Sequence, residues 1–201
     1  MIRNVIFDFG AVLFDWQPKN IVKRFTSSPD EQALLLSEVL QHPDWLSLDR
    51  GTMLMAEVIP KFAARTQLTE NRMQDFIDHV LDNLIMIDET RALIDQLNDR
   101  GFKLFYLTNM SSAFFENLNE RHQLETLFEG GLVSGKELVI KPETAIFEIM
   151  VERFSIVPAQ SLFIDDQALN IQVAKEVGFQ GYVFNEPVKS CAEIRNFLIN
   201  N

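Results

Sequence analysis

The stretch Val5-Ile6-Phe7-Asp8-Phe9-Gly10-Ala11-Val12-Leu13, near the amino terminus, decides how the rest of the chain is interpreted. Its apolar, partly β-branched start indicates a buried strand, and the carboxylate followed by a glycine indicates that this strand ends in a loop. Ligands of open α/β sheets bind outside the carboxyl ends of the strands, so Asp8 is a candidate for chemistry. The alternative is that Asp8 caps the following turn through its side-chain oxygen.

Three later apolar runs also end in polar residues. They supply Thr108-Asn109, Lys141-Pro142 and Asp165-Asp166, the last followed by Asn170. Together with Asp8, these segments resemble the four core motifs of the haloacid dehalogenase-like hydrolase superfamily, most closely its small-capped phosphatases. The resemblance extends over nearly the whole chain, although residues 17–87 match only loosely.

The apolar pattern predicts the order of helices and strands. Residues 17–87 have apolar positions at helical spacing, which predicts helices over 30–40, 52–66 and 69–84. After residue 87 the pattern alternates, with strands predicted over 103–107, 161–164 and 182–184 and helices over 88–100, 111–122, 142–154, 168–177 and 191–199. Such alternation implies a parallel sheet with helices on both faces. We predict an α/β fold, which the resemblance makes a Rossmann-like doubly wound core domain (residues 1–16 and 88–201) with an inserted small helical cap domain (residues 17–87), called the cap below.

The resemblance assigns a nucleophile and a metal site to the acidic motifs. It implies that Asp8 attacks phosphorus and forms an aspartyl-phosphate. It also implies that Asp8, Asp166 and the backbone carbonyl of Gly10 bind Mg²⁺, a cation that prefers oxygen ligands, with Asp165 and Asn170 in further or water-mediated contacts. Without the resemblance, the Asp165-Asp166 pair is equally well explained as a cap on the helix that follows it.

The two remaining motifs concern the phosphate. The resemblance implies that the hydroxyl of Thr108 donates to a phosphate oxygen, and that Asn109 either reaches the phosphate or orients the nucleophile. It implies that Lys141 neutralises charge shared by the nucleophile and the phosphate. The alternatives are a Thr-Asn turn that caps the next helix and an ordinary solvated lysine.

One position departs from the phosphatase pattern. Most phosphatases of this superfamily have a second Asp two residues after the nucleophile, which acts as general acid and base, but this chain has Gly10. The carbonyl needed for the metal is retained, whereas the acid is lost, and general acid catalysis is typically worth about 10²- to 10⁴-fold. A subset that resembles sugar-phosphate phosphatases has another Asp seven residues after the nucleophile, which is Asp15 here. Either Asp15 replaces the acid or it holds the cap linker, and we favour the linker.

The predicted function is a Mg²⁺-dependent phosphomonoester hydrolase that acts on a small phosphorylated metabolite, with a sugar phosphate favoured. A metal-independent 2-haloacid dehalogenase also lacks the second Asp, but it would not need the Asp165-Asp166 pair. A catalytically weak protein that binds a phosphorylated ligand on the same fold is a further alternative. In the cap and at its entry, Trp16, Trp45 and Asp49-Arg50-Gly51 are candidates for lining the pocket, although a buried aromatic and a turn explain them better.

Composition limits the partners and the compartment. The 201 residues carry a net charge of −11, which opposes binding to nucleic acid and to anionic membranes. Cys191 is the only cysteine, so an intrachain disulfide is excluded and a reducing compartment fits. The sequence shows no signal peptide or membrane span, so we expect a cytoplasmic protein. It does not distinguish a monomer from a homodimer.

Overall fold

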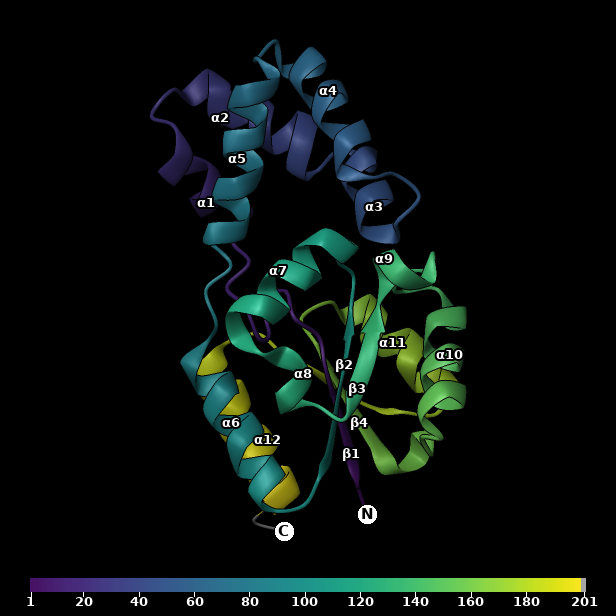
Figure 1. Cartoon of the computed structure of the whole chain (residues 1–201). Helices are drawn as coiled ribbons and strands as arrows, with labels where there is room; N and C mark the ends of the chain where they lie inside the picture. The colour runs from purple at the N-terminus through teal and green to yellow at the C-terminus, as the bar shows by residue number, and fades with distance from the viewer. Residues whose placement is uncertain (200–201) are drawn as a thin grey trace.

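A computed structural model describes residues 1–199 of the chain, and its centre is a five-stranded parallel sheet. The strands run with their carboxyl ends toward the top of Figure 1. Their order across the sheet is β3-β2-β1-β4-β5, so the first strand of the chain lies in the middle. The strands are β1 Asn4–Phe7, β2 Lys103–Thr108, β3 Gly130–Val133, β4 Ser161–Asp165 and β5 Gln180–Val183.

Both faces of the sheet are buried, which explains why the strands are continuously apolar. Val5 and Phe7 belong to one apolar cluster and Ile6 to a second one, because successive side chains of a strand point to opposite faces. The first cluster includes α6 Asp88–Asp99, α7 Ser112–His122, α8 Leu124–Leu127 and α12 Pro187–Ile199, and the second includes α10 Thr144–Phe154 and α11 Ala168–Val177. The predicted doubly wound α/β core is thereby confirmed.

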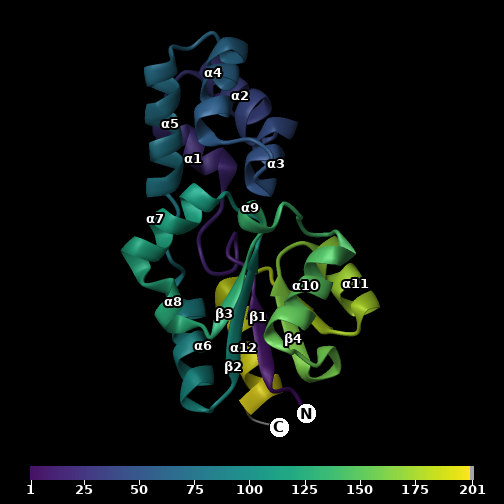
Figure 2. The same cartoon turned by 45° about the vertical axis from the view of Figure 1, so that its right-hand side comes forward.

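The cap is helical throughout and lies beyond the carboxyl ends of the strands (Figures 1 and 2). Side-chain caps help to begin its helices: Ser28 accepts from the Glu31 amide and Thr69 from the Arg72 amide. The helices are α1 Pro18–Phe25, α2 Pro29–Leu35, a π-helical turn η1 Leu36–Leu40, α3 Pro43–Arg50, α4 Met55–Thr66 and α5 Glu70–Asp82.

Two short linkers connect the cap to the core and pair with each other. The amide of Asp15 donates to the Ile85 carbonyl (2.8 Å), and the amide of Ile87 donates to the Leu13 carbonyl (2.8 Å). Phe14 lies between these two bonds in an antiparallel bridge with Met86. The entry and exit of the cap therefore form one paired junction.

Several elements differ from the sequence prediction. Helices α1 and α3 were not predicted, although Pro18 and Pro43 stand at their first positions, where proline is favoured. Strand β3 was missed because it begins with two glycines; a Cβ on Gly131 would lie 2.3 Å from the ring of Tyr106. Helix α10 begins at Thr144, two residues after the predicted start at Pro142. The closing helix α12 begins before the predicted residue 191, and β5 ends one residue before the predicted 184.

Two short elements complete the core, α9 Ser134–Glu137 after β3 and a 3₁₀ turn η2 Pro158–Gln160 before β4. Helix α9 faces the cap and contacts α3 (Figure 1). Within residues 1–199, none of the helices is both long and apolar enough to cross a membrane.

Candidate active site

The acidic motif residues meet at the carboxyl ends of β1 and β4, which are neighbours in the sheet. Because Phe7 pairs with Ile164, Asp8 and Asp165 follow at the same level, and the Asp8 amide donates to the Ile164 carbonyl (2.9 Å). One carboxylate oxygen from each of Asp8, Asp165 and Asp166 lies within 4.8 Å of the other two. The sheet register therefore brings together three acids that are up to 158 positions apart in the chain.

Lys141 forms an ion pair with two of these acids. Its Nζ lies 2.7 Å from Oδ1 of Asp8 and 2.7 Å from Oδ2 of Asp165, and its side chain is 1% exposed. The side chain of Asn109 holds the backbone of this lysine: its Oδ1 accepts from the Lys141 amide (2.8 Å) and its Nδ2 donates to the Lys141 carbonyl (2.9 Å). Asn109 thus positions Lys141, which in turn contacts the nucleophile candidate.

Burial and like charges shift the ionisation of this cluster. Burial raises the pKa of Asp8 to about 7; Asp165 and Asp166 act in the same direction, and Lys141 opposes them. Burial and the charge of Asp165 also raise the pKa of Asp166. For Lys141, burial disfavours the charge, but Asp8 and Asp165 outweigh it, so the pKa of Lys141 lies above its usual value. The cluster has more negative charge than its lysine neutralises, which favours a further cation.

The two adjacent acids of the fourth motif have different surroundings. Asp165 is fully buried, and its carboxylate accepts from Lys141, from the Gln167 amide (2.8 Å) and from Nδ2 of Asn170 (3.0 Å to each oxygen). Asp166 is only half-buried, and it accepts from the side chain of Gln167 (2.5 Å). The bond from the Gln167 amide to Asp165 closes an Asx-type turn before α11, whose N-cap residue Gln167 has no side-chain capping bond, while the carboxylate of Asp166 faces a cavity.

Asp8, Asp166 and Gly10 could hold a divalent cation. All three line one cavity, and together they offer two carboxylates and a backbone carbonyl, the ligand types that Mg²⁺ prefers. Three carboxylates meet here and a single ammonium, that of Lys141, pairs with two of them, so the local charge favours a further cation. The donor set and its electrostatics therefore fit Mg²⁺.

Thr108 fits a phosphate ligand. It ends β2 and is 1% exposed, yet its hydroxyl oxygen has no hydrogen-bond partner among the described residues. A buried polar group normally has a hydrogen-bond partner, so an unpaired hydroxyl at a strand end indicates that a bound ligand supplies the partner. Nearby, Ser111 caps the start of α7 by accepting from the Phe114 amide (3.3 Å). The predicted capping role in this motif is filled by Ser111 and leaves the Thr108 hydroxyl available.

A cavity of about 250 Å³ lies between this edge of the sheet and the cap. Its core side is polar, and its cap side is mostly apolar. The cap and its linkers contribute Trp16, Leu40, Trp45, Leu84 and one acid, Asp49, and the core adds Met110 and Phe114. Asp15 is outside this lining: its carboxylate accepts from the side chain of Gln17 (2.8 Å) and its backbone belongs to the linker junction.

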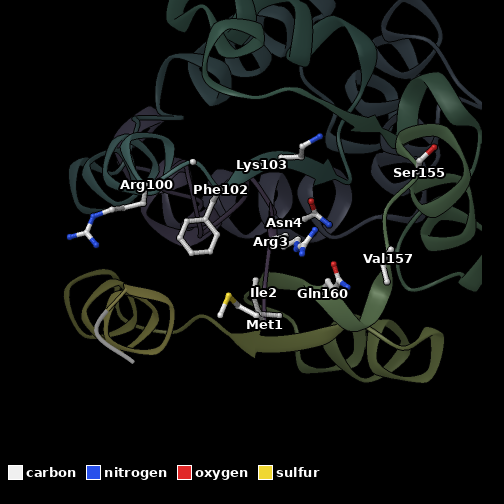
Figure 3. A pocket seen from close by; sticks show the side chains of 11 residues that line it. Met1, Ile2, Arg3, Asn4, Arg100, Phe102, Lys103, Ser155, Val157 and Gln160 are labelled. Atoms are coloured by element: carbon white, nitrogen blue, oxygen red, sulfur yellow. The ribbon is translucent and has the colours of Figure 1, made fainter.

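A larger hollow of about 460 Å³ lies at the opposite end of the sheet and is shown in Figure 3. It is bordered by Arg3 and Lys103 at the amino ends of β1 and β2, and by Arg100. Lys103 is exposed and pairs with Glu129 at 3.7 Å. None of the motif residues borders this hollow. The smaller cavity is therefore the candidate active site.

The contacts between core and cap were not predicted from sequence, and two of them hold the end of α3. The hydroxyl of Ser134 donates to the backbone carbonyl of Asp49 (2.5 Å), and Glu143 forms a two-pronged ion pair with Arg50. These partners are 85 and 93 positions apart, so no local pattern could have revealed them. The only available signal was the position of Glu143, two residues after the motif lysine.

The family follows from comparison with known proteins. The chain matches the family described as "Haloacid dehalogenase-like hydrolase" over residues 5–183, and it belongs to this family. The resemblance seen in the four motifs is thereby confirmed.

Curated relatives in this family include phosphatases. The sesquiterpene phosphatase astK of Aspergillus oryzae is 25% identical over 196 residues, which cover 98% of this chain and 96% of that protein. The D-ribitol-5-phosphate phosphatase of Bacteroides thetaiotaomicron is 23% identical over 193 residues, covering 90% of this chain and 91% of that protein. These similarities make the chain a hydrolase that acts on phosphate esters.

A solved structure shares the fold. A haloacid dehalogenase family enzyme of Bacteroides thetaiotaomicron, crystallised with magnesium and inorganic phosphate, has a TM-score of 0.78 at 20% identity. The match covers 92% of this chain and 95% of that one. The arrangement of sheet, flanking helices and cap is thus an established one.

Proposed function

We propose that this chain is a Mg²⁺-dependent phosphomonoester hydrolase that works through a phosphorylated Asp8. The observation that carries the proposal is the position of Asp8 between the ammonium of Lys141 (2.7 Å) and two further carboxylates, in the cavity beside the cap. The unpaired hydroxyl of Thr108 in the neighbouring strand supports a phosphate at the same edge.

The reaction has two steps. An oxygen of Asp8 attacks phosphorus, the bond from phosphorus to the ester oxygen breaks, and the alcohol leaves after taking up a proton. Water then attacks the aspartyl-phosphate, the new bond to Asp8 breaks, and inorganic phosphate is released. Asp8, Asp166 and the Gly10 carbonyl would hold Mg²⁺, which would supply positive charge that offsets the repulsion between the carboxylate and the phosphate.

The remaining side chains prepare the first step. Lys141 donates to Asp8 and lowers the repulsion between its carboxylate and the incoming phosphate. Asn109 fixes Lys141 through both backbone bonds, so the ammonium does not have to reorganise during the reaction. The hydroxyl of Thr108 donates to a phosphate oxygen. In this scheme Asp165 holds Lys141 and Asn170 in place, and Asp15 holds the linker.

Two substrate classes are supported by different observations. The start Asp8-Phe9-Gly10-Ala11-Val12 favours a sugar phosphate, and one relative is a D-ribitol-5-phosphate phosphatase. The apolar cap side of the cavity favours the ester of an apolar alcohol, and another relative is a sesquiterpene phosphatase. A sugar would leave its hydroxyl groups without partners against such a wall, which is costly.

The proposal is tested by phosphate release from a panel of esters with and without Mg²⁺. We expect release to require Mg²⁺ and to fall to background in Asp8→Asn. The control is Asp95→Asn, which removes a carboxylate that pairs with Arg91 on the exposed face of α6. Full activity of Asp8→Asn would contradict the proposal.

Other outcomes would identify the alternatives. Chloride release from a 2-haloacid in the presence of a chelator would mean a dehalogenase. Thermal stabilisation by a phosphorylated ligand without turnover of any ester would mean a binding protein. Within the panel, the ratio of kcat/KM for a prenyl monophosphate to that for a pentitol phosphate decides between the two substrate classes.

A further inference from the structure

The proposed function leaves one proton without a donor. The alcohol departs as an alkoxide unless an acid protonates it, and Gly10 stands where most relatives of this type have that acid. Three acids line the cavity: Asp8, Asp49 and Asp166. Asp8 is the nucleophile and Asp166 is a metal ligand in the proposed function, so only Asp49 has no role. It comes from the cap, on the side from which the leaving alcohol would extend.

Asp49 is held over the core by the residues around it. Its backbone carbonyl accepts from the hydroxyl of Ser134 (2.5 Å), and the next residue, Arg50, is ion-paired with Glu143. The residue after that, Gly51, has φ +84° and approaches the backbone of Gly135 so closely that a Cβ would lie 2.2 Å from its carbonyl oxygen. Three consecutive cap residues thus contact the core, and the position of Asp49 is fixed by both its neighbours and its own backbone.

The carboxyl group of Asp49 lies next to the phosphate-binding motif. The backbone amide of Ser111 and the side chain of Trp45 are close enough to it to favour its charged form and oppose the rise of its pKa. Ser111 follows Thr108 by three residues and begins α7, so the carboxyl group is anchored beside the loop that leaves β2. Both Asn109 of that loop and Trp45 line the same cavity as Asp49.

The surroundings favour the protonated form of Asp49. Asp49 is half-buried at the cavity wall, and its loss of hydration there raises the pKa of its carboxyl group to about 8, against the opposing effect of Ser111 and Trp45. Arg50 beside it pairs with Glu143, and Arg65 of the adjoining α4 pairs with Asp44. Near neutral pH this carboxyl group therefore carries a proton that it can give away, as a general acid must.

We propose that Asp49 is the general acid of the phosphatase reaction and occupies the role that Gly10 cannot fill. As Asp8 bonds to phosphorus and the ester bond breaks, the Asp49 proton passes to the departing alcohol oxygen. The resulting Asp49 carboxylate then takes a proton from the water that attacks the aspartyl-phosphate, which restores the acid. The inference rests on the proposed function and adds to it a catalytic residue from the cap.

The test compares esters whose leaving groups differ in their need for a proton. In Asp49→Asn, kcat/KM for an alkyl phosphate should fall by about 10²- to 10⁴-fold. The value for 4-nitrophenyl phosphate should change little, because nitrophenolate leaves without protonation. With that aryl ester we further expect a burst of nitrophenol followed by slow phosphate release, because the second step has lost its base.

The matched control is Asp44→Asn in the same helix. The Asp44 carboxylate pairs with Arg65 (2.6 Å) and does not line the cavity. The ratio of kcat/KM for the alkyl ester to that for the aryl ester should therefore be the same in this variant as in the wild type.

Equal losses for both esters in Asp49→Asn would overturn the proposal and make Asp49 a residue that merely positions the cap. A second measurement needs no variant: in the wild type, kcat/KM across a series of alkyl and aryl phosphates should depend only weakly on the pKa of the leaving alcohol, and a steep dependence would also overturn it. Asp8→Asn separates the two proposals. If that variant is inactive while Asp49→Asn shows no preference for the aryl ester, only the inference about Asp49 fails; if Asp8→Asn is active, the proposed function itself fails.

Discussion

The two walls of the active-site cavity are built in different ways. On the core wall, Asp8, Lys141 and Asp165 form a chain of buried ion pairs between adjacent strand ends, and every one of these groups has a partner within 3 Å. On the cap wall, the side chains are largely apolar, and the wall is attached to the core through a few contacts around Asp49 and Gly51.

This difference separates two requirements of a phosphatase. Charges that act on the phosphate must be fixed in advance, and a rigid sheet edge provides that. The wall that meets the leaving alcohol determines which alcohol is accepted, and it can change without disturbing the charges. The comparison can be tested by removing one feature of each wall and measuring stability and activity together.

The largest effect should come from the core wall, with Lys141→Met. The substitution leaves Asp8 and Asp165 as buried carboxylates without a counter-charge, and breaking a buried pair in this way typically costs about 3–5 kcal/mol. The free energy of unfolding should fall by that amount at neutral pH, and turnover should be lost. Chemical denaturation followed by circular dichroism measures the first quantity.

Lys103→Met is the control for that prediction. Lys103 is 61% exposed and pairs with Glu129 at 3.7 Å, so its removal should cost less than about 1 kcal/mol. Acidification should also reduce the cost of Lys141→Met, because the two carboxylates then become neutral. If both lysine variants were equally stable, the core wall would not depend on its buried ion pairs.

A smaller effect is expected where the cap wall meets the core, with Gly51→Ala. Gly51 and Gly101 both have positive φ, +84° and +77°, and an alanine in that region costs about 1–2 kcal/mol at either site. Only at Gly51 would the added Cβ also collide with a backbone, that of Gly135, which adds about 1–3 kcal/mol or displaces the cap. We expect Gly51→Ala to lower kcat/KM as well as stability, whereas Gly101→Ala should lower stability alone.

The same two walls explain what could be predicted from the sequence. The core motifs were recognisable because each is a local sequence pattern, in which an apolar run ends and a polar residue such as Asp8 or Lys141 follows. In a parallel sheet the carboxyl ends of all strands lie at the same edge, so these residues come close together without any further sequence signal. The roles given to these residues remain predictions, although their positions at one edge follow from the sheet order.

The attachment of the cap could not be predicted, because it depends on residues with no local signature. Ser134 and Glu143 contact the carboxyl end of α3 only after the whole chain has folded. The surroundings that raise the pKa of Asp49 likewise combine the start of α7 with the cap. Strand β3 was hidden for a related reason. The Tyr106 ring of the neighbouring strand leaves no room for a side chain at Gly131, and the Phe154 ring of α10 leaves none at Gly130. These glycines remove the apolar pattern that would have revealed the strand.

A third prediction concerns the pH dependence of the cap wall. In the unfolded chain Asp49 has a pKa near 3.8, and burial raises it to about 8 in the folded protein. Between these values the folded state binds more protons than the unfolded state, so this group makes stability fall as pH rises, by at most about 1.4 kcal/mol per pH unit. Asp49→Asn removes that contribution.

Stability curves of the two proteins between pH 5 and pH 8 measure this effect. Asp8 and Asp166 also have raised pKa values and give the wild type a slope of the same sign, but they are present in both proteins and cancel in the difference. The variant should therefore gain stability relative to the wild type as pH rises. Parallel curves would mean that Asp49 is ionised in the folded protein, which would also remove the basis for its role as an acid.

The smallest change in stability is expected for Thr108→Val. Its hydroxyl is buried without a partner, so an isosteric methyl group should leave the free energy of unfolding unchanged or raise it slightly. The binding of inorganic phosphate should weaken by about 10- to 100-fold, because one hydrogen bond to a charged ligand is lost. In the matched variant Thr90→Val, the lost hydroxyl donates to the Val12 carbonyl (2.6 Å), and neither residue lines the cavity, so stability should fall by about 0.5–1.5 kcal/mol while phosphate binding is unchanged. Calorimetric titration with phosphate and chemical denaturation of both variants distinguish a hydroxyl that binds the ligand from one that stabilises the fold. A loss of stability in Thr108→Val would mean that the Thr108 hydroxyl stabilises the fold.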